Sequence, residues 1–367
     1  MVGNGKILCL LGVCSFWIFV SCLEIKNERH QFADYAEQLM DSVIKYHRDG
    51  NMGLCNDNDP VIKPLIADNV AAEERALPLW PYARLFSAVN ALAVAQHATN
   101  YDVWTDTVLF KAFRQYDDFA KVSADSSDSF YDDSSWLGIG YVEHYNRTHN
   151  SASLVAAEKI WRFLENGSST YSYAPATVLA LKLYETTGNI LYLKDGRKLY
   201  HWTKDYLQDA SDGLYMDNVK LDGKIDSIKY ADNNGQMLQA SALLYHTTGE
   251  GQYLEDAHRL AQSCFDYFFH ELEIDNERIT VPKDGNMWCM AILMRGFVEL
   301  YCVDGNRQYL DDFRKTLEFM WKQNTRLCKS MECNRSSDDM SQRMDEGSWW
   351  LTQIAVVEMY ARLAVLD

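Results

Sequence analysis

Apolar and amphipathic segments alternate along the chain. Segments 190–208 and 250–271 place pairs of large apolar residues seven positions apart, with charged residues between them. This spacing puts one apolar stripe on an α-helix and leaves the opposite face charged, as in a helix that covers a core from outside. Segments 175–187 and 234–247 are apolar nearly all round, which indicates helices that are covered on several sides. The pattern therefore predicts inner helices that alternate with outer helices.

A related pair of helices recurs three times in the second half of the chain. Each copy carries Leu-Tyr near the end of an apolar segment, then a glycine, then Tyr-Leu at the start of an amphipathic segment. The glycines are Gly188, Gly249 and Gly305, and glycine suits the left-handed conformation that ends many helices. Each copy therefore predicts an inner helix, a tight turn and an outer helix.

Extended over the whole chain, the pattern predicts an all-α fold. Twelve helices form six hairpins of one inner and one outer helix, and six inner helices ringed by six outer helices make a closed (α/α)6 toroid. An open helical solenoid is the alternative, but it needs terminal helices with polar outer faces, and the last predicted helix is too apolar for that place. Strand signals are weak and brief, as at "ERITV". The predicted helices are 30–48, 83–98, 101–119, 133–146, 152–165, 175–187, 190–208, 234–247, 250–271, 286–303, 306–324 and 346–365.

The first 22 residues have the pattern of a signal peptide. Lys6 precedes an apolar run of fourteen residues, too short to span a bilayer comfortably, and Ser21-Cys22 follow. A cysteine at this place is typical of bacterial lipoproteins, in which it becomes the lipidated first residue, and ordinary secretion is the alternative. We therefore expect residues 1–22 to be removed, residues 23–367 to form a single domain, and the protein to be exported and lipid-anchored at the bacterial cell surface or in the periplasm.

The composition is that of a folded, acidic protein. Hydrophobic residues make up 47% of the chain and charged residues 24%. The net charge of −17 repels nucleic acid and disfavours a polyanionic ligand. The cysteines after the leader fit no zinc pattern. Cys264, Cys289 and Cys302 fall in apolar helical segments and are predicted to be unpaired core residues, whereas Cys328 and Cys333 are placed to pair across a loop.

Two adjacent aspartates stand just ahead of the fourth predicted helix. Asp132 and Asp133 lie in "FYDDSSW", with aromatic residues on both sides. Capping of a helix start explains one aspartate. Two neighbouring carboxyl groups in an irregular turn also repel each other, so that one keeps its proton while the other is charged. Glycoside hydrolysis needs this division between a proton donor and an anion, so the pair is the candidate catalytic centre.

Segments that precede other inner helices carry side chains suited to an uncharged, polyhydroxylated ligand. Inner helices of a toroid begin around a common mouth, so we expect these segments to meet there. Aromatic rings stack on the C–H faces of sugars, and amides and carboxylates bind hydroxyl groups. The predicted substrate-binding residues are Trp80, Tyr82, Arg84, Tyr131, Trp136, Asp232, Asn233, Asn234, Gln236, Trp288 and Trp349.

The stretch around the aspartates resembles the Tyr-Asp-Asp-x-x-Trp signature of glycoside hydrolase family 76, the endo-α-1,6-mannanases. "DNNGQMLQASALLYHTTGEGQYLEDA" is similar to the family's Asn-Gln-Gly segment, and Arg295-Gly-Phe resembles the Arg-Gly of a later inner helix. The resemblance implies an (α/α)6 catalytic domain that cleaves α-1,6-mannosidic linkages in mannan with retention of configuration, without a metal or other cofactor. Carried over by position, Asp132 is the nucleophile and Asp133 the general acid/base.

Other functions of a helical toroid stay open at this point. An enzyme for unsaturated uronides needs cations at the mouth, where Arg84 and Lys283 are the candidates. An epimerase uses histidines as proton shuttles, and the histidines here fall mostly within helices, away from the mouth. A non-catalytic glycan-binding lipoprotein gains little from two crowded carboxyl groups. We therefore expect a monomeric α-mannan hydrolase that binds no nucleic acid and contacts the membrane only through its lipid anchor.

Overall fold

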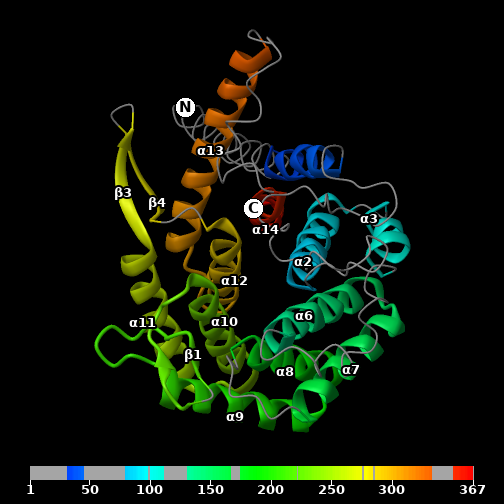
Figure 1. Ribbon diagram of the computed structural model, residues 1–367, viewed down its shortest axis with the longest axis vertical. Coiled ribbons are helices and arrows are strands. Elements are labelled where there is room, and N and C mark those ends of the chain that lie inside the picture. Colours follow the sequence, from blue (N-terminus) through cyan, green and yellow to red (C-terminus); the bar gives the residue numbers. More distant parts are fainter. Residues whose placement is uncertain are drawn as a thin grey trace, which may run out of the picture.

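The protein is a ring of helices (Figure 1). The computed structural model describes residues 31–44, 79–97, 100–110, 130–166, 174–220, 222–274, 277–283, 286–332 and 350–366. Helices occur at each of the twelve predicted places, although several begin or end a few residues from the predicted bounds. The predicted all-α (α/α)6 toroid is confirmed.

The inner helices close into a ring. Each inner helix packs on the next one along the chain, and the last, α14, packs on the first, α2, which excludes an open solenoid. These helices are apolar nearly all round because they touch neighbours on several sides. The inner helices are α2 (Leu79–Gln96), α6 (Phe130–Thr148), α8 (Ala174–Thr187), α10 (Ala231–Thr248), α12 (Met287–Asp304) and α14 (Trp350–Leu366).

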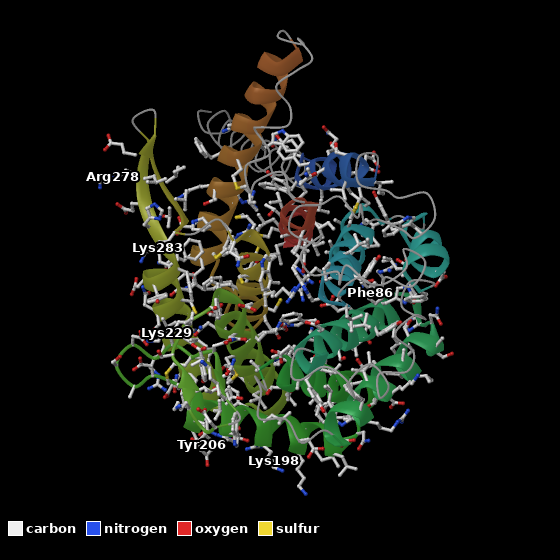
Figure 2. The ribbon with its side chains drawn as sticks, viewed as in Figure 1. Phe86, Lys198, Tyr206, Lys229, Arg278 and Lys283 are labelled. Carbon is white, nitrogen blue, oxygen red and sulfur yellow. The ribbon has the colours of Figure 1, made fainter. Side chains whose placement is uncertain are left out.

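The outer helices bury one stripe against this ring and leave the opposite face charged. Lys198 of α9, for example, points away from the ring (Figure 2). The outer layer comprises the helix over residues 31–44, α3 (Asn100–Trp104) with the π-helical segment η2 (Thr105–Leu109), α7 (Ser151–Asn166), α9 (Ile190–Leu207), α11 (Gly251–Phe268) and α13 (Gln308–Glu332).

In the part of the chain that the structure describes, two short antiparallel hairpins interrupt the helical pattern. β1 (Asn218–Val219) pairs with β2 (Ile225–Asp226) between α9 and α10. β3 (Phe269–Ile274) pairs with β4 (Glu277–Pro282) between α11 and α12. The prediction of helix up to residue 271 was therefore wrong at its end, because Phe269 already pairs with Pro282 in the second hairpin.

The repeated glycines end helices as predicted. Gly188, Gly249 and Gly305 have φ values of 69°, 70° and 71°, in the left-handed region. Each backbone N–H donates to the carbonyl of the tyrosine four residues earlier, at 2.8 Å in all three copies. A residue with a Cβ is strained in this conformation, so the glycine allows the chain to turn directly into the next outer helix.

The helices α10 and α12 approach each other most closely at two glycines. A Cβ atom on Gly235 would lie 2.5 Å from the Cα atom of Leu293, and one on Gly296 would lie 2.6 Å from the carbonyl oxygen of Gly235. Because neither helix has a side chain at these positions, the two backbones touch. This contact also brings the first turn of α10 close to the first turn of α12.

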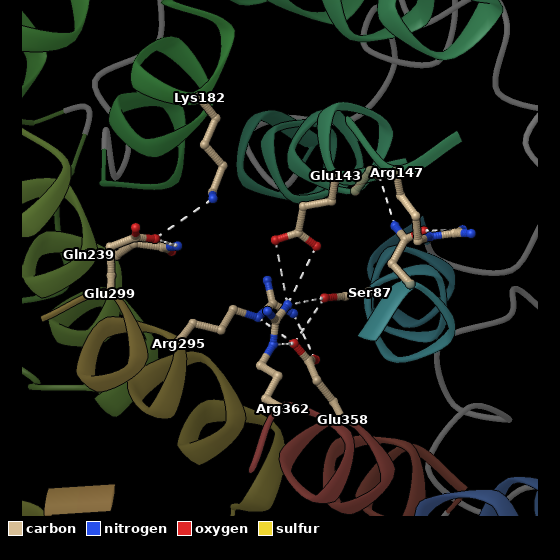
Figure 3. Close-up of polar contacts among 11 residues, drawn as sticks. Ser87, Glu143, Arg147, Lys182, Gln239, Arg295, Glu299, Glu358 and Arg362 are labelled. Atoms are coloured by element: carbon tan, nitrogen blue, oxygen red, sulfur yellow. Dashed lines mark hydrogen bonds and ion pairs between the residues drawn. The ribbon is translucent and has the colours of Figure 1, made fainter. Parts of the chain in front are cut away.

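A charged network lies inside the ring (Figure 3). Glu358 of α14 accepts hydrogen bonds from Arg295 of α12 at 2.6 and 2.8 Å, from Arg362 at 2.7 Å and from Ser87 of α2 at 2.9 Å. Arg362 also lies 3.4 Å from Glu143 of α6. Burial raises the pKa of Glu358, but the charges of Arg295 and Arg362 outweigh it and lower the pKa to about 2. The network therefore joins four inner helices through charged hydrogen bonds.

The predictions about cysteines and the membrane anchor are confirmed only in part, since some of these residues lie outside the described part of the chain. Cys264 and Cys289 are unpaired and buried as predicted, whereas Cys302 is unpaired but exposed, so its prediction as a core residue was wrong. No helix of the described part has the length and apolarity needed to cross a bilayer. The predicted signal peptide, its lipidated Cys22 and the predicted partner Cys333 lie outside the described residues, so anchor and disulfide stay predictions.

Candidate active site

The aspartate pair lies inside the first turn of α6. The helix begins at Phe130, so Asp132 and Asp133 are helical, and the predicted irregular turn ahead of the helix was wrong. Successive residues of a helix point about 100° apart around its axis, so the two carboxyl groups leave the helix in different directions. The helix N-terminus favours negative charge at this place. The Asp133 side chain is buried, and Oδ1 of Asp132 has no hydrogen-bond partner among the described residues.

Three tryptophans from three inner helices meet beside this pair. The ring centroids of Trp136 (α6) and Trp288 (α12) lie 6.3 Å apart at 70°, and those of Trp288 and Trp80 (α2) lie 5.6 Å apart at 42°. All three were predicted as substrate-binding residues. The structure brings them together because the inner helices begin around one mouth, and we call these three rings the tryptophan wall; aromatic rings of this kind commonly line ligand sites.

Arg84 brings a positive charge to the site. Its guanidinium lies 3.8 Å from the ring centroid of Trp136 and 5.6 Å from that of Trp288. The side chain is 3% exposed, and none of its three nitrogens has a hydrogen-bond partner among the described residues. Burial and the neighbouring charge of Arg295 lower the pKa of Arg84 to about 9, against the opposing charge of Asp232. Arg84 is therefore still charged at neutral pH and offers its N–H groups to whatever enters the site.

The first two turns of α10 add Asp232 and Gln236. Both are buried, and Oδ1 of Asp232 and both amide atoms of Gln236 have no hydrogen-bond partner within the described ranges. Burial raises the pKa of Asp232, opposed by the charge of Arg84 and by a hydrogen bond from the thiol of Cys289. Buried polar atoms without partners are costly, so their gathering here marks a place built to bind polar groups.

Burial raises the pKa values of both carboxyl groups of the pair. Burial, followed by the charges of Asp133, Asp232 and Asp217, raises the pKa of Asp132 well above its usual value, and Arg84 opposes the shift. Burial raises the pKa of Asp133 to about 7, again against Arg84. At neutral pH the pair therefore carries a proton that an isolated aspartate would have lost, so a proton donor and an anion stand side by side.

Comparisons with known proteins concern the sequence and the fold as a whole. Residues 165–285 match the family model of Glycosyl hydrolase family 76. A family 76 glycoside hydrolase from a bovine Bacteroides thetaiotaomicron strain is 26% identical over 91% of this chain and 78% of that chain, with a TM-score of 0.74. A family 76 mannosidase from Bacteroides thetaiotaomicron is 29% identical over 92% of this chain and 98% of that chain, with a TM-score of 0.73. The predicted resemblance to glycoside hydrolase family 76 is confirmed.

Family 76 proteins are glycoside hydrolases, so the predicted enzyme class is confirmed as well. An α-1,6-mannanase of Salegentibacter has been solved as an inactive variant in which asparagines replace two neighbouring aspartates, in complex with α-1,6-mannotriose. It is 20% identical over 92% of this chain and all (100%) of that chain, with a TM-score of 0.67, which shows a shared fold. No curated protein sequence matches the chain.

Some residues predicted for the site have other roles in this fold. Asn234 is fully buried, accepts a hydrogen bond from the backbone N–H of Tyr215 at 2.8 Å and donates to the carbonyls of Tyr215 at 3.1 Å and Tyr230 at 2.8 Å. Its prediction as a substrate ligand was wrong, because its amide is fully used in holding the preceding segment. Asn233, one residue earlier, donates to Asp217 at 2.8 Å.

Two tyrosines that were predicted to bind substrate also have other surroundings. Tyr131 stacks on Phe163 of the outer helix α7, with centroids 5.2 Å apart and 12° between the rings, so it faces away from the tryptophan wall. Tyr82 is 5% exposed and belongs to the hydrophobic core, since residues two apart on α2 do not share the face of Arg84. The structure therefore does not bring these two tyrosines to the site, and Trp349 lies outside the described residues.

Two residues of the site carried no recognisable signal in the sequence. Cys289 looks like any apolar helical position, and its role depends on the close approach of α10 and α12 described above. Asp217 lies beside a hairpin whose strands are two residues long, too short for an alternating pattern. No group of three or more metal-binding side chains with the arrangement of a metal site occurs in the part of the chain that the structure describes.

Proposed function

We propose that this protein hydrolyses α-1,6-mannosidic linkages in mannan with retention of anomeric configuration, using Asp132 and Asp133. The observation that carries the proposal is the adjacent carboxyl pair, which shares a proton at neutral pH beside a buried arginine and an aromatic wall. The similar proteins add support, since one is described as a mannosidase and another as an α-1,6-mannanase.

The proposed reaction proceeds in two displacements. The carboxylate of Asp132 attacks the anomeric carbon and forms a mannosyl ester, while Asp133 gives its proton to the oxygen of the leaving sugar. Asp133, now charged, takes a proton from a water molecule, whose oxygen attacks the same anomeric carbon. The ester bond to Asp132 breaks, the mannosyl group leaves as a free reducing end with its original configuration, and both carboxyl groups return to their starting states.

The carried-over roles require the proton to reside on Asp133 when the bond breaks. The charges around the pair favour the opposite arrangement before substrate enters, because Asp132 is surrounded by three other carboxyl groups. The transition state of glycoside hydrolysis carries positive charge near the anomeric carbon. This charge lowers the pKa of the carboxyl group that it approaches, so the substrate itself moves the proton from Asp132 to Asp133.

The surroundings of the pair favour a neutral sugar over a uronide. Arg84 faces Asp132, Asp133 and Asp232, so a sugar carboxylate beside it would meet three acidic groups. Lys283, the other predicted cation, donates a hydrogen bond to a backbone carbonyl of α11 at 3.1 Å and lies over Tyr267. A sugar with hydroxyl groups alone can accept from Arg84 and donate to the carboxyl groups.

Release of reducing ends from linear α-1,6-mannan tests the proposal. We expect the protein to release reducing ends from this polymer, with no release from α-1,2- or α-1,3-linked mannan and none from unsaturated uronides, because the site recognises one linkage geometry of a neutral sugar. The assay is run with the protein as expressed, without added metal. Activity on the uronide alone, or binding of mannan without release, would overturn the proposal in favour of the two alternatives.

A further inference from the structure

The inner helices α10 and α12 run side by side in a fixed register (Figure 1). A Cβ atom on Gly235 would lie 2.5 Å from the Cα atom of Leu293, and one on Gly296 would lie 3.0 Å from the Cβ atom of Leu238. A step of three residues along α10 is therefore matched by three residues along α12, and both helices start at the mouth. The same register fixes which residues of their first turns face each other.

This register places Cys289 beside Asp232. Cys289 precedes Leu293 by four residues and Asp232 precedes Gly235 by three, so each lies about one helical turn nearer the mouth than the closest contact. The thiol of Cys289 is unpaired and 3% exposed, and it donates a hydrogen bond to the Asp232 carboxyl group. Burial, followed by the charge of Asp232, raises the pKa of this thiol well above its usual value, so the sulfur keeps its hydrogen and stays a donor at neutral pH.

The Asp232 carboxyl group combines support from the protein with an oxygen that has no partner in the described part of the chain. Besides the thiol, it accepts a hydrogen bond from the backbone N–H of Asn233. Its Oδ1 has no hydrogen-bond partner among the described residues, although Asp232 is only 7% exposed. The same holds for the amide of Gln236, one turn further along α10, and for the guanidinium of Arg84. Because buried polar atoms without partners are costly, these atoms together indicate a ligand that offers hydroxyl groups.

We propose that Cys289 is a positioning residue of the active site, whose thiol fixes the Asp232 carboxyl group so that Oδ1 accepts a hydrogen bond from a hydroxyl group of the sugar. The inference rests on the proposed function, since that sugar is the mannosyl unit beside the catalytic pair. A carboxyl group that is fixed before the substrate arrives loses less conformational freedom on binding. Trp288, the residue before Cys289, belongs to the tryptophan wall, so this turn of α12 serves both the apolar and the polar side of one ligand.

Cys289→Ala is the variant that tests the proposal, because it removes the donor. We expect kcat/KM on linear α-1,6-mannan to fall roughly three- to tenfold, a factor that corresponds to the loss of one hydrogen bond. The loss should appear mainly in KM, with a matching loss of affinity for α-1,6-mannotriose in isothermal titration calorimetry. Cys289→Ser, which keeps a short donor at the same place, should stay within about twofold of the wild type.

Cys264→Ala is the matched control. Cys264 is also unpaired and fully buried, but it lies on the outer helix α11. Its replacement should lower the free energy of unfolding about as much as Cys289→Ala does, while kcat/KM and the affinity for α-1,6-mannotriose stay unchanged. If the loss of any buried thiol lowered activity, both variants would lose it equally, and that result would overturn the inference.

Raman spectroscopy observes the hydrogen bond itself, without turnover. The S–H stretching band that disappears in Cys289→Ala should move to higher frequency when Asp232→Ala removes the acceptor, whereas the band of Cys264 should not move. The inference is overturned if the Cys289 band does not move, or if Cys289→Ser loses as much affinity as Cys289→Ala. Absence of wild-type turnover would overturn the proposed function instead, and the Raman shift together with the affinity for α-1,6-mannotriose would still decide the role of Cys289.

Discussion

Alanine in place of Asp132 is expected to lower kcat/KM on α-1,6-mannan by roughly 10⁴-fold or more, because no covalent intermediate can form. Asp133→Ala should also be nearly inactive on the polymer, since the leaving sugar then departs without a proton. An aryl α-mannoside with a good leaving group separates the two roles, because such a group departs unprotonated. Asp133→Ala should therefore cleave the aryl mannoside, whereas Asp132→Ala should not.

Azide provides the decisive comparison between the two variants. In Asp133→Ala, azide replaces water in the second displacement and should give an α-mannosyl azide with faster turnover. In Asp132→Ala, azide takes the place of the missing carboxylate and should give the β-mannosyl azide. Asp205→Ala, on the exposed face of α9, is the control and should match the wild type. An Asp132→Ala enzyme that cleaves mannan near the wild-type rate would contradict the assignment, and exchanged azide products would reverse the two roles.

Glu358→Gln is expected to destabilise the fold by about 3–5 kcal/mol. The substitution leaves Arg295, which is 3% exposed, without its charged partner inside the ring and removes the charge that Arg362 contacts. The matched control is Glu250→Gln. Its pair with Arg197 is exposed at the surface, with both side chains 37% exposed, so its loss should cost about 0–1 kcal/mol.

Denaturant unfolding at several pH values measures this effect. The pKa of Glu358 is lowered in the folded protein, so its stabilising contribution is present above the pKa of the unfolded chain and is lost as the pH falls toward about 2. The difference in unfolding free energy between wild type and Glu358→Gln should therefore shrink on acidification. A difference below about 1 kcal/mol at neutral pH would contradict the role of this network as a structural ion pair.

The helices could be predicted from the sequence because their signals are local. The apolar stripe of α11 lies within one segment, and Gly249 and Gly305 mark the ends of α10 and α12 without reference to distant residues. The closed ring followed from the apolar last helix. The weak strand signal at "ERITV" marks β4, whereas the start of β3 was predicted as helix because this strand continues directly from α11.

The active site could be predicted only where its residues stand at helix starts. Asp132 and Trp288 lie on first turns that a toroid brings to one mouth, and Trp136 lies one turn after Asp132. The role of Asn234 depends on a backbone nineteen residues earlier, and that of Asp217 on an amide sixteen residues later. Such contacts join segments across the fold and leave no periodic pattern, so composition and spacing cannot reveal them.

The anomeric configuration of the first product tests the central claim most directly. Proton NMR during digestion of linear α-1,6-mannan by the wild-type protein distinguishes the α-anomer from the β-anomer before mutarotation mixes them. If Asp132 and Asp133 act as nucleophile and acid/base, the α-anomer appears first and the β-anomer only later. A β-anomer that appears first, or a polymer left intact, would contradict it.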